Sequence, residues 1–196
     1  MTCIVGLIDK GNVLIGADSI ASNYQNTWVL RNRKVFRRGV YIMGFTGSPR
    51  MQQLIMYAGE DPPRPPQKKT DLHRFLCMDW VNWVREIYKS GGILRTQEGV
   101  ESAGSFLVAT QGRLFHVESD FQVGESACGF DAVGSGDEVA LGSLFTSKDM
   151  PPRKRIHTAL AAAEQWCEGV GRPFRILTLS PPQEKKTPPS SPTTTE

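Results

Sequence analysis

The sequence has little of what marks membrane proteins or disulfide-stabilised secreted domains. No apolar run approaches the ~20 residues that a helix needs to cross a bilayer, and no signal peptide precedes the first strand-like segment. The four cysteines, Cys3, Cys77, Cys128 and Cys167, are far apart and include no Cys-x-x-Cys pair. We therefore expect a soluble cytoplasmic protein, a reducing compartment and mostly buried thiols.

Organised patterns of charge or histidine are also absent. The formal net charge is only +3, and the basic residues are scattered without an RNA- or DNA-binding motif, so we expect neither a nucleic-acid nor a membrane partner. His73, His116 and His157 fit no metal-ligand spacing. We expect no metal and no cofactor, and we expect these histidines to be structural or surface residues.

What is present is the composition of one globular domain. The chain has 196 residues, of which 39% are hydrophobic and 22% are charged, and this suits a single core. Residues 181–196 are rich in Pro, Ser and Thr and have no large apolar side chain to bury, so we expect a disordered tail there. The domain is predicted to occupy residues 1–180.

Hydrophobic patterning predicts strands, two helices, strands, two helices and a final strand. The first two strands, Cys3–Leu7 and Val13–Ala17, are joined by turn-forming residues that suit a hairpin. Further strands are expected at Thr27–Leu30, Lys34–Phe36, Val40–Phe45, Ser105–Thr110, Leu114–Val117, Phe121–Val123, Ala132–Val133 and Phe174–Leu179. Helices are expected at Pro49–Ala58, Asp71–Lys89, Gly136–Phe145 and Pro152–Cys167.

This element order predicts an α+β fold. Hairpin connections imply antiparallel sheets, and the pairs of helices must cover exposed sheet faces. The predicted architecture is a four-layer αββα sandwich of two antiparallel sheets with helices outside. The turn Gly44-Phe45-Thr46-Gly47-Ser48 leads into the first helix, with Ser48 as its N-cap and Pro49 as its first residue.

Thr2 is the candidate nucleophile. A threonine at the true N-terminus can use its own α-amine as the base for its hydroxyl, and an unperturbed α-amine titrates near ~7.7–8.0. A neighbouring cation lowers that pKa, and a buried cation needs a carboxylate to hold it. Lys34 and Asp18, both at strand ends, are the candidates. Gly47 N–H can stabilise the tetrahedral oxyanion.

The segments around these residues resemble proteasome β-subunits and their bacterial relative, the HslV peptidase, which are N-terminal-nucleophile hydrolases. The matching segments are Thr2-Cys3-Ile4-Val5-Gly6, Gly16-Ala17-Asp18-Ser19, Lys34-Val35, Gly44-Phe45-Thr46-Gly47-Ser48 and Ala132-Val133-Gly134-Ser135-Gly136. Asp18 and Lys34 follow Thr2 at the family's spacing. The resemblance implies that Ser135 supports the nucleophile and its amine, and we also expect Ser135 to cap the next helix. Residues 60–130 match only in pattern.

Three positions bear on how far this resemblance extends. Proteasome subunits have an aspartate in an Asp-x-x-Ser turn near the active amine, where this chain reads Cys167-Glu168-Gly169-Val170, although HslV relatives also lack that aspartate. Ile20 replaces a polar or basic residue, which predicts an apolar pocket beside Thr2. Exposure of Thr2 is expected to require removal of Met1 alone by a methionine aminopeptidase.

The proposed site residues also have simpler interpretations. Asp18 could cap a loop, and Lys34 could be one more solvated cation in an arginine-rich segment, but their joint spacing favours a shared site. Cys3 could be a reactive thiol, but a strand directs it away from the face of its neighbour Thr2, so we expect it in the core.

The predicted function is a threonine-type peptidase that forms an acyl-enzyme, with Thr2, Asp18, Lys34, Gly47 and Ser135 as catalytic residues. The resemblance implies a homo-oligomeric ring that encloses the sites and degrades peptides or unfolded protein, in some relatives with an ATP-dependent unfoldase. One alternative is a non-catalytic structural or assembly protein of the same fold that retains Met1. Another is a small-molecule amidase. The loop at residues 60–69 and the tail could serve in assembly or docking.

Overall fold

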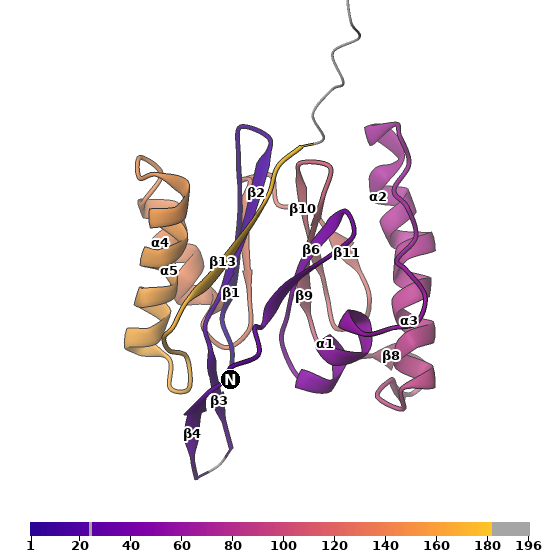
Figure 1. Cartoon of the computed structure of the whole chain (residues 1–196), viewed down its shortest axis with the longest axis horizontal. Helices are drawn as coiled ribbons and strands as arrows, with labels where there is room; N and C mark the ends of the chain where they lie inside the picture. Colours follow the sequence, from indigo (N-terminus) through magenta and orange to yellow (C-terminus); the bar gives the residue numbers. More distant parts are fainter. Residues whose placement is uncertain (24, 182–196) are drawn as a thin grey trace, which may run out of the picture.

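The structure is a computed structural model that describes residues 1–23 and 25–181. Two large antiparallel sheets pack face to face, and helices cover both outer faces (Figure 1). The predicted four-layer αββα sandwich is therefore confirmed. The predicted disordered tail, apart from Pro181, lies outside the described residues.

The first sheet contains both ends of the folded chain. Its strands are β1 (Ile4–Asp9), β2 (Asn12–Ala17), β12 (Phe130–Val133) and β13 (Arg175–Leu179). They follow the order β12-β1-β2-β13, and β1 pairs with β2 so that Ile4 lies opposite Ala17. The predicted hairpin is confirmed, and its two central residues, Lys10 and Gly11, have φ values of 48° and 79°. Positive φ at both positions is what a two-residue turn between twisted strands requires.

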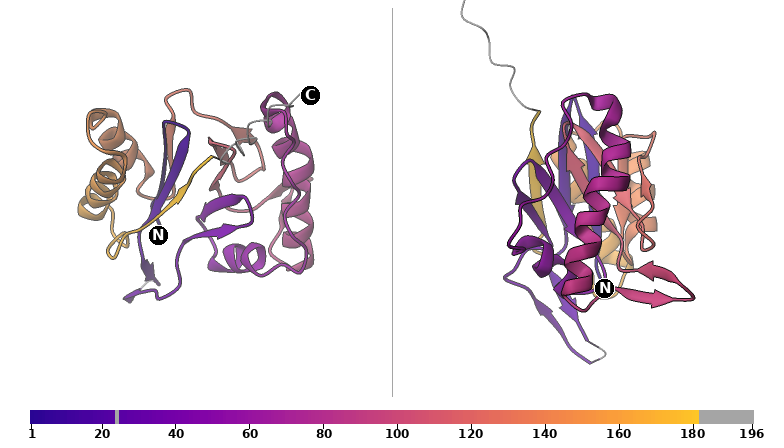
Figure 2. Two further views of the ribbon diagram at one scale, coloured as in Figure 1. Left: turned by 45° about the horizontal axis from the view of Figure 1, so that its top comes forward. Right: turned by 90° about the vertical axis from the view of Figure 1, so that its right-hand side faces the viewer.

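The second sheet is built from the middle of the chain and has the order β11-β10-β9-β6-β5. Its strands are β5 (Val35–Arg38), β6 (Tyr41–Phe45), β9 (Phe106–Thr110), β10 (Arg113–Val117) and β11 (Val123–Gly124). Two small hairpins project from the body (Figure 2). They are formed by β3 (Ile20–Ser22) with β4 (Thr27–Val29), and by β7 (Arg95–Gln97) with β8 (Val100–Ser102). Of these four strands only β4 was expected.

Helices pack on the outer face of each sheet. On the second sheet lie α1 (Pro49–Met56) and a continuous helical run of η1 (Lys69–Asp71), α2 (Leu72–Phe75), η2 (Leu76–Trp80) and α3 (Val81–Ser90). On the first sheet lie α4 (Asp137–Thr146) and α5 (Pro152–Trp166). The run η1–α3 matches the single helix predicted there, except that η2 is a π-helical turn. No helix in residues 1–23 and 25–181 is both long enough and apolar enough to cross a membrane.

The start of α1 agrees with the prediction. Ser48 is its N-cap, with its Oγ accepting a hydrogen bond from Arg50 N at 3.2 Å, and Pro49 is the first helical residue. Proline is well suited to this position because its missing N–H would have no helical partner there. The cap fixes where the turn after β6 ends and the helix begins.

Alternation along β1 divides its side chains between two layers. Ile4 packs between the sheets against residues such as Ile42 and Leu107, whereas Cys3 and Val5 face the helices α4 and α5. Burying a side chain of this size contributes roughly 1.5–3 kcal/mol, so both layers hold β1 firmly. The prediction that Cys3 belongs to the core is confirmed, since it is fully buried.

The prediction of mostly buried thiols is wrong for the other cysteines. Cys77 and Cys167 are only partly buried, and Cys128 is exposed. Cys128 lies in the turn before β12, where no layer covers it. All four cysteines are free thiols.

Candidate functional site

Sheet register brings the five predicted site residues to one end of the sandwich. Thr2 precedes β1, and Asp18 follows β2, the antiparallel neighbour of β1. Ser135 follows β12, the other neighbour of β1. In the second sheet Lys34 precedes β5, and Gly47 follows β6, which pairs with β5. Five positions that are distant in sequence therefore meet where both sheets end.

Lys34 and Asp18 form a buried ion pair beneath Thr2. The Lys34 Nζ lies 2.8 Å and 2.9 Å from the two carboxylate oxygens of Asp18. Asp18 is fully buried, and its oxygens also accept backbone hydrogen bonds from Cys3 N and Ile20 N, each at 3.0 Å. A buried carboxylate needs such donors because it has left the solvent. The pair is fixed in place, which excludes the interpretation of Lys34 as a solvated cation.

The loop that carries Asp18 is tied to the segment before β13. Ser19 N donates to Gly171 O at 2.9 Å, and Ser19 Oγ donates to Pro173 O at 2.5 Å. These bonds hold the chain that leaves β2 and so fix the direction of the Asp18 side chain. Ser19 itself is buried. Within the described residues it forms no hydrogen bond to Thr2 or Lys34.

The Lys34 ammonium reaches the hydroxyl of Thr2. Lys34 Nζ donates to Thr2 Oγ1 at 3.1 Å and to Met1 O at 3.2 Å. The Thr2 hydroxyl in turn donates to Met1 O at 2.6 Å. In the chain that retains Met1, the hydroxyl proton therefore points at the carbonyl of the preceding residue.

Burial lowers the pKa of Lys34 below its ordinary value of 10.5, and the Asp18 carboxylate opposes this effect without cancelling it. Desolvation disfavours the charged form of any amine, while a nearby carboxylate favours it. Burial shifts the pKa of Cys3 in the opposite direction. Together with the charge of Asp18, it raises the pKa of this thiol to about 12. Cys3 is therefore a protonated core thiol at neutral pH.

Ser135 contacts the backbone of Thr2 on both sides. Thr2 N donates to Ser135 Oγ at 3.2 Å, and Ser135 Oγ lies 3.3 Å from Thr2 O, to which it can donate. The prediction that Ser135 also caps α4 is wrong, because the N-cap is Gly136 and the Ser135 hydroxyl makes no capping bond to the first turn. The Ser135 hydroxyl bonds to the backbone of Thr2 instead.

Gly134 permits this close approach. Its φ of 103° lies in a region that side chains disfavour, and a Cβ there would overlap the carbonyl oxygen of Thr2. The glycine before Ser135 is thus required for the backbone around Thr2 to pass so near to β12.

The turn after β6 places Gly47 beside Thr2. Thr46 fixes this turn, since its N and its Oγ1 both donate to Ser105 O, at 3.1 Å and 2.7 Å. Gly47 lines the same cavity as Thr2. Its N–H has no hydrogen-bond acceptor in the part of the chain that the structure describes, so this donor is available to a ligand.

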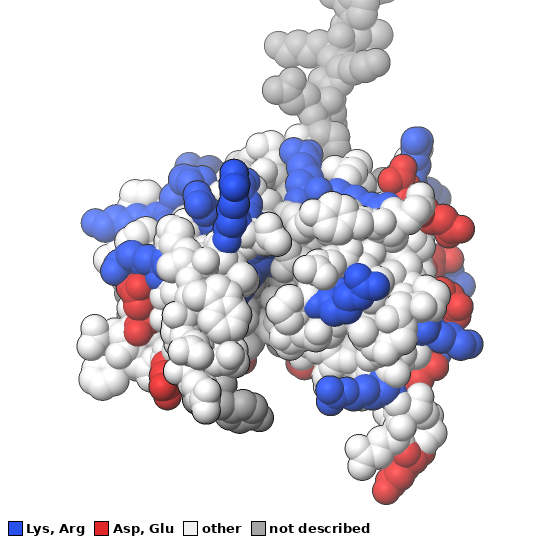
Figure 3. Space-filling model, turned by 60° about the horizontal axis from the view of Figure 1, so that its bottom comes forward, with Lys and Arg blue, Asp and Glu red and all other residues white. Residues whose placement is uncertain are grey.

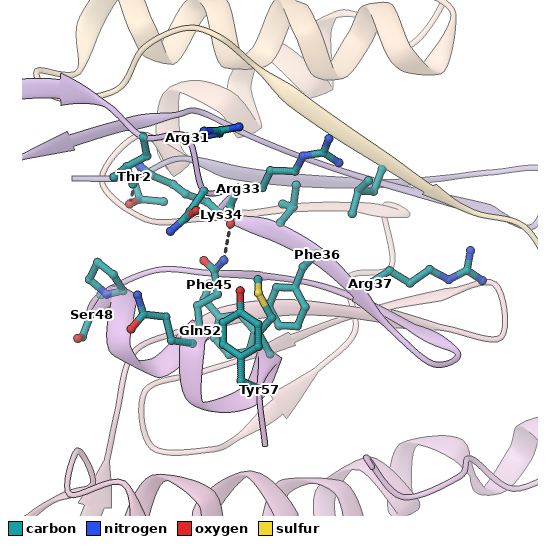
Figure 4. A pocket seen from close by; sticks show the side chains of 18 residues that line it. Thr2, Arg31, Arg33, Lys34, Phe36, Arg37, Phe45, Ser48, Gln52 and Tyr57 are labelled. Atoms are coloured by element: carbon teal, nitrogen blue, oxygen red, sulfur yellow. Dashed lines mark hydrogen bonds between the residues drawn. The ribbon is translucent and has the colours of Figure 1, made fainter. Parts of the chain in front are cut away.

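A cavity of about 490 Å³ opens next to Thr2. Figure 4 shows Thr2 and Lys34 on one wall, and Gln52 of α1 and Tyr57, which follows α1, on the opposite one. Its apolar lining includes Leu30, Val35, Phe36, Phe45, Met56, Tyr57 and Leu177. Ile20 does not line it, so the apolar character predicted from that residue has another source.

No second carboxylate supports Thr2 among the described residues. Asp18 is the only acidic side chain there that hydrogen-bonds to Lys34, and none bonds to Thr2. The segment at Glu168–Gly169 instead lies against the Met1 side chain. Within residues 1–23 and 25–181, no group of three or more His, Cys, Asp or Glu side chains is placed to hold a metal.

Comparison with known proteins identifies the fold. No family model and no curated protein sequence matches the chain. Among solved structures, Thiobacillus denitrificans BPH is 20% identical with a TM-score of 0.77, covering 93% of this chain and 100% of that one. A second BPH structure, in complex with epoxomicin, is 21% identical with a TM-score of 0.74, covering 91% of this chain and 100% of that one.

A eukaryotic HslV, from Trypanosoma brucei, is 15% identical with a TM-score of 0.63, and the match covers 91% of this chain and 99% of the HslV chain. The chain has the proteasome-like N-terminal-nucleophile hydrolase fold.

The sequence prediction located Thr2 and the ion pair of Lys34 and Asp18, but it missed the walls of the cavity. Gln52 and the arginines of the segment before β5 belong to those walls, and the only sequence signal for them was their proximity to Ser48 and Lys34.

Proposed function

We propose that the chain is a threonine-type peptidase that cleaves peptide bonds through an acyl-enzyme on Thr2 once Met1 has been removed. The observation that carries this proposal is the 3.1 Å contact between Lys34 Nζ and Thr2 Oγ1, beside a cavity and above a buried Asp18. The likeness in fold to HslV and to BPH in complex with epoxomicin supports it.

The proposed reaction uses groups that are already adjacent. Thr2 Oγ1 attacks the scissile carbonyl, and its proton passes to the free α-amine of Thr2, which later protonates the leaving amine. The resulting ester is hydrolysed by water, which returns the hydroxyl. Lys34, held by Asp18, places a positive charge next to both Thr2 groups and lowers the pKa of the amine. Gly47 N–H faces the developing oxyanion.

Ser135 positions the nucleophile in this scheme. Its hydroxyl contacts both the nitrogen and the carbonyl oxygen of Thr2, so it orients the residue that attacks. When Met1 is absent, the same hydroxyl can accept a hydrogen bond from the α-amine. Ser135 is thus a positioning residue rather than a proton carrier.

Met1 blocks this chemistry for two physical reasons. The nitrogen of Thr2 is then an amide, which has no basic lone pair, and the Met1 carbonyl accepts the hydrogen bonds of the hydroxyl and of Lys34. A chain that keeps Met1 would be the non-catalytic structural protein of the same fold. Removal of Met1 frees both donors and creates the base.

We also propose the assembly that the resemblance implies, a homo-oligomeric ring, with an ATP-dependent unfoldase as a further partner. Large apolar side chains that are exposed in the single chain support a subunit contact, among them Phe145 at 59% and Trp166 at 76% exposure. Light scattering coupled to size-exclusion chromatography tests the ring. A monomer at working concentration would contradict it and would favour the open-site amidase.

The hydrolytic function is tested with a panel of fluorogenic peptides and simple amides. We expect wild type to cleave peptides, Thr2→Ser to retain part of this activity, and Thr2→Ala to lose it. Thr70→Ala, an exposed threonine remote from the cavity, is the matched control and should behave as wild type. Full activity of Thr2→Ala would reject Thr2 as the nucleophile, and cleavage of simple amides alone would favour a small-molecule amidase.

A further inference from the structure

Three arginines line the cavity beside Thr2, and within residues 1–23 and 25–181 no acidic side chain lines it. Arg31 and Arg33 belong to the segment between β4 and β5, and Arg37 belongs to β5. All three are exposed, and none forms an ion pair with a residue in the described part of the chain. Asp18, whose carboxylate lies beneath Thr2, is already engaged by Lys34.

Several arginines elsewhere in the chain have carboxylate partners. Arg38, the next residue on β5, pairs with Asp61 at 3.7 Å, and Arg85 pairs with Glu101 at 2.6 Å. The arginines at the cavity, by contrast with Arg38 and Arg85, have no such partner among the described residues. On the face shown in Figure 3, lysine and arginine side chains lie beside the cleft, and most acidic side chains lie towards the edges.

The arginine-bearing segment is held in position. Gln52 of α1 donates a side-chain hydrogen bond to the carbonyl oxygen of Arg33, which links the two walls of the cavity (Figure 4). Arg31 and Arg33 lie on the same side as Thr2, and Arg37 lies at the far end. Positive charge therefore extends along the cavity rather than sitting at one point.

Between these charges the cavity is apolar and suited to a large side chain. Phe36 and Phe45 stack with their ring centroids 5.8 Å apart, and Met56 lies in the same lining. Thioether and aromatic surfaces accept bulky apolar groups without a polar penalty. The cavity thus offers an apolar floor with a cationic rim.

We propose that this cavity selects acidic peptides, in which a bulky apolar residue occupies the floor and neighbouring Asp or Glu residues meet the arginines. This inference rests on the proposed peptidase function and names its substrate class. A cleft lined by charges of one sign concentrates its field and raises the local concentration of oppositely charged ligands. Exposed charge pairs are individually weak and are screened by salt, so the preference should be graded and salt-dependent.

The test compares three fluorogenic peptides that share a leucine at the cleavage site and carry Glu, Gln or Lys at the two flanking positions. We expect kcat/KM to fall in the order Glu, Gln, Lys, with about a tenfold span at low salt that shrinks as salt rises. In the double variant Arg31→Gln/Arg33→Gln the span should contract several-fold. Arg95→Gln, an exposed arginine on β7 remote from the cavity, should leave the span unchanged.

Binding to the Thr2→Ala variant separates this inference from the peptidase proposal. Fluorescence anisotropy of the same three peptides reports their affinity without any need for cleavage. Tighter binding of the Glu peptide, lost in Arg31→Gln/Arg33→Gln, supports acidic selection even if no peptide is cleaved. Equal affinity for the Glu and Lys peptides, or a preference that the arginine substitutions do not change, overturns the inference even if cleavage is observed.

Discussion

Replacing Asp18 by asparagine tests the buried ion pair, because the two side chains have nearly the same shape and differ in charge. Asp18 is fully buried, and Lys34 is only 7% exposed. Removing one partner of a buried pair typically costs about 3–5 kcal/mol, since it leaves the other charge uncompensated. A domain of this size has a free energy of unfolding of roughly 5–15 kcal/mol. We therefore expect Asp18→Asn to fold with a large loss of stability at pH 7.

The loss should depend on pH in a defined direction. The pKa of Lys34 is lower in the folded state than its ordinary 10.5, and it falls further without Asp18. The folded state then binds fewer protons than the unfolded state between the two pKa values, so stability rises with pH in that interval. The difference between Asp18→Asn and wild type should consequently shrink as pH rises from 7 towards 10.

Urea unfolding followed by tryptophan fluorescence measures these free energies, since the chain has four tryptophans. Asp149→Asn, at an exposed position, should stay within about 0.5 kcal/mol of wild type. The double variant Asp18→Asn/Lys34→Met should recover part of the loss, because no buried charge is left. A single variant as stable as wild type at pH 7, or a double variant less stable than the single one, would refute the account of this pair.

Three further predictions concern the chemistry. Ser135→Ala loses a hydrogen bond worth about 0.5–1.5 kcal/mol, so kcat should fall about two- to tenfold, and the free energy of unfolding should fall by no more than about 1.5 kcal/mol; an unchanged kcat argues against positioning. The pH profile of kcat/KM should be bell-shaped, rising as the Thr2 amine loses its proton and falling as Lys34 does, below pH 10.5; a plateau through that pH contradicts a charged Lys34. Iodoacetamide should label exposed Cys128 but not buried Cys3, whose pKa is about 12; rapid labelling of Cys3 by mass spectrometry would contradict its burial.

Sequence patterning located most of the fold because the large strands bury alternating or continuous apolar residues. β9, for example, is buried along its whole length. The hairpin of β7 and β8 escaped prediction because its residues are exposed or only partly buried and show no apolar period. β3 was missed for a related reason, since its three residues are only partly buried.

The site was predictable in its centre and not at its edges. Thr2, Lys34 and Asp18 could be found because fixed spacing from a strand start reflects fixed sheet register. The sequence did not reveal that Ser135 leaves α4 uncapped. A serine before a helix is ordinarily its cap, and only the folded position of Thr2 shows that the Ser135 hydroxyl bonds elsewhere. The arginine-lined cavity depends on how α1 faces β5, which no local pattern encodes.

The central claim is that Thr2 becomes an N-terminal nucleophile, and the most direct measurement is the mass of the N-terminal peptide after reaction with a peptide epoxyketone. Such a compound presents two electrophilic centres, which suit the hydroxyl and the amine of one N-terminal threonine. The account predicts a chain that lacks Met1 and carries the adduct on Thr2, with no adduct on Thr2→Ala. Retained Met1, or an adduct that forms equally on Thr2→Ala, would contradict it.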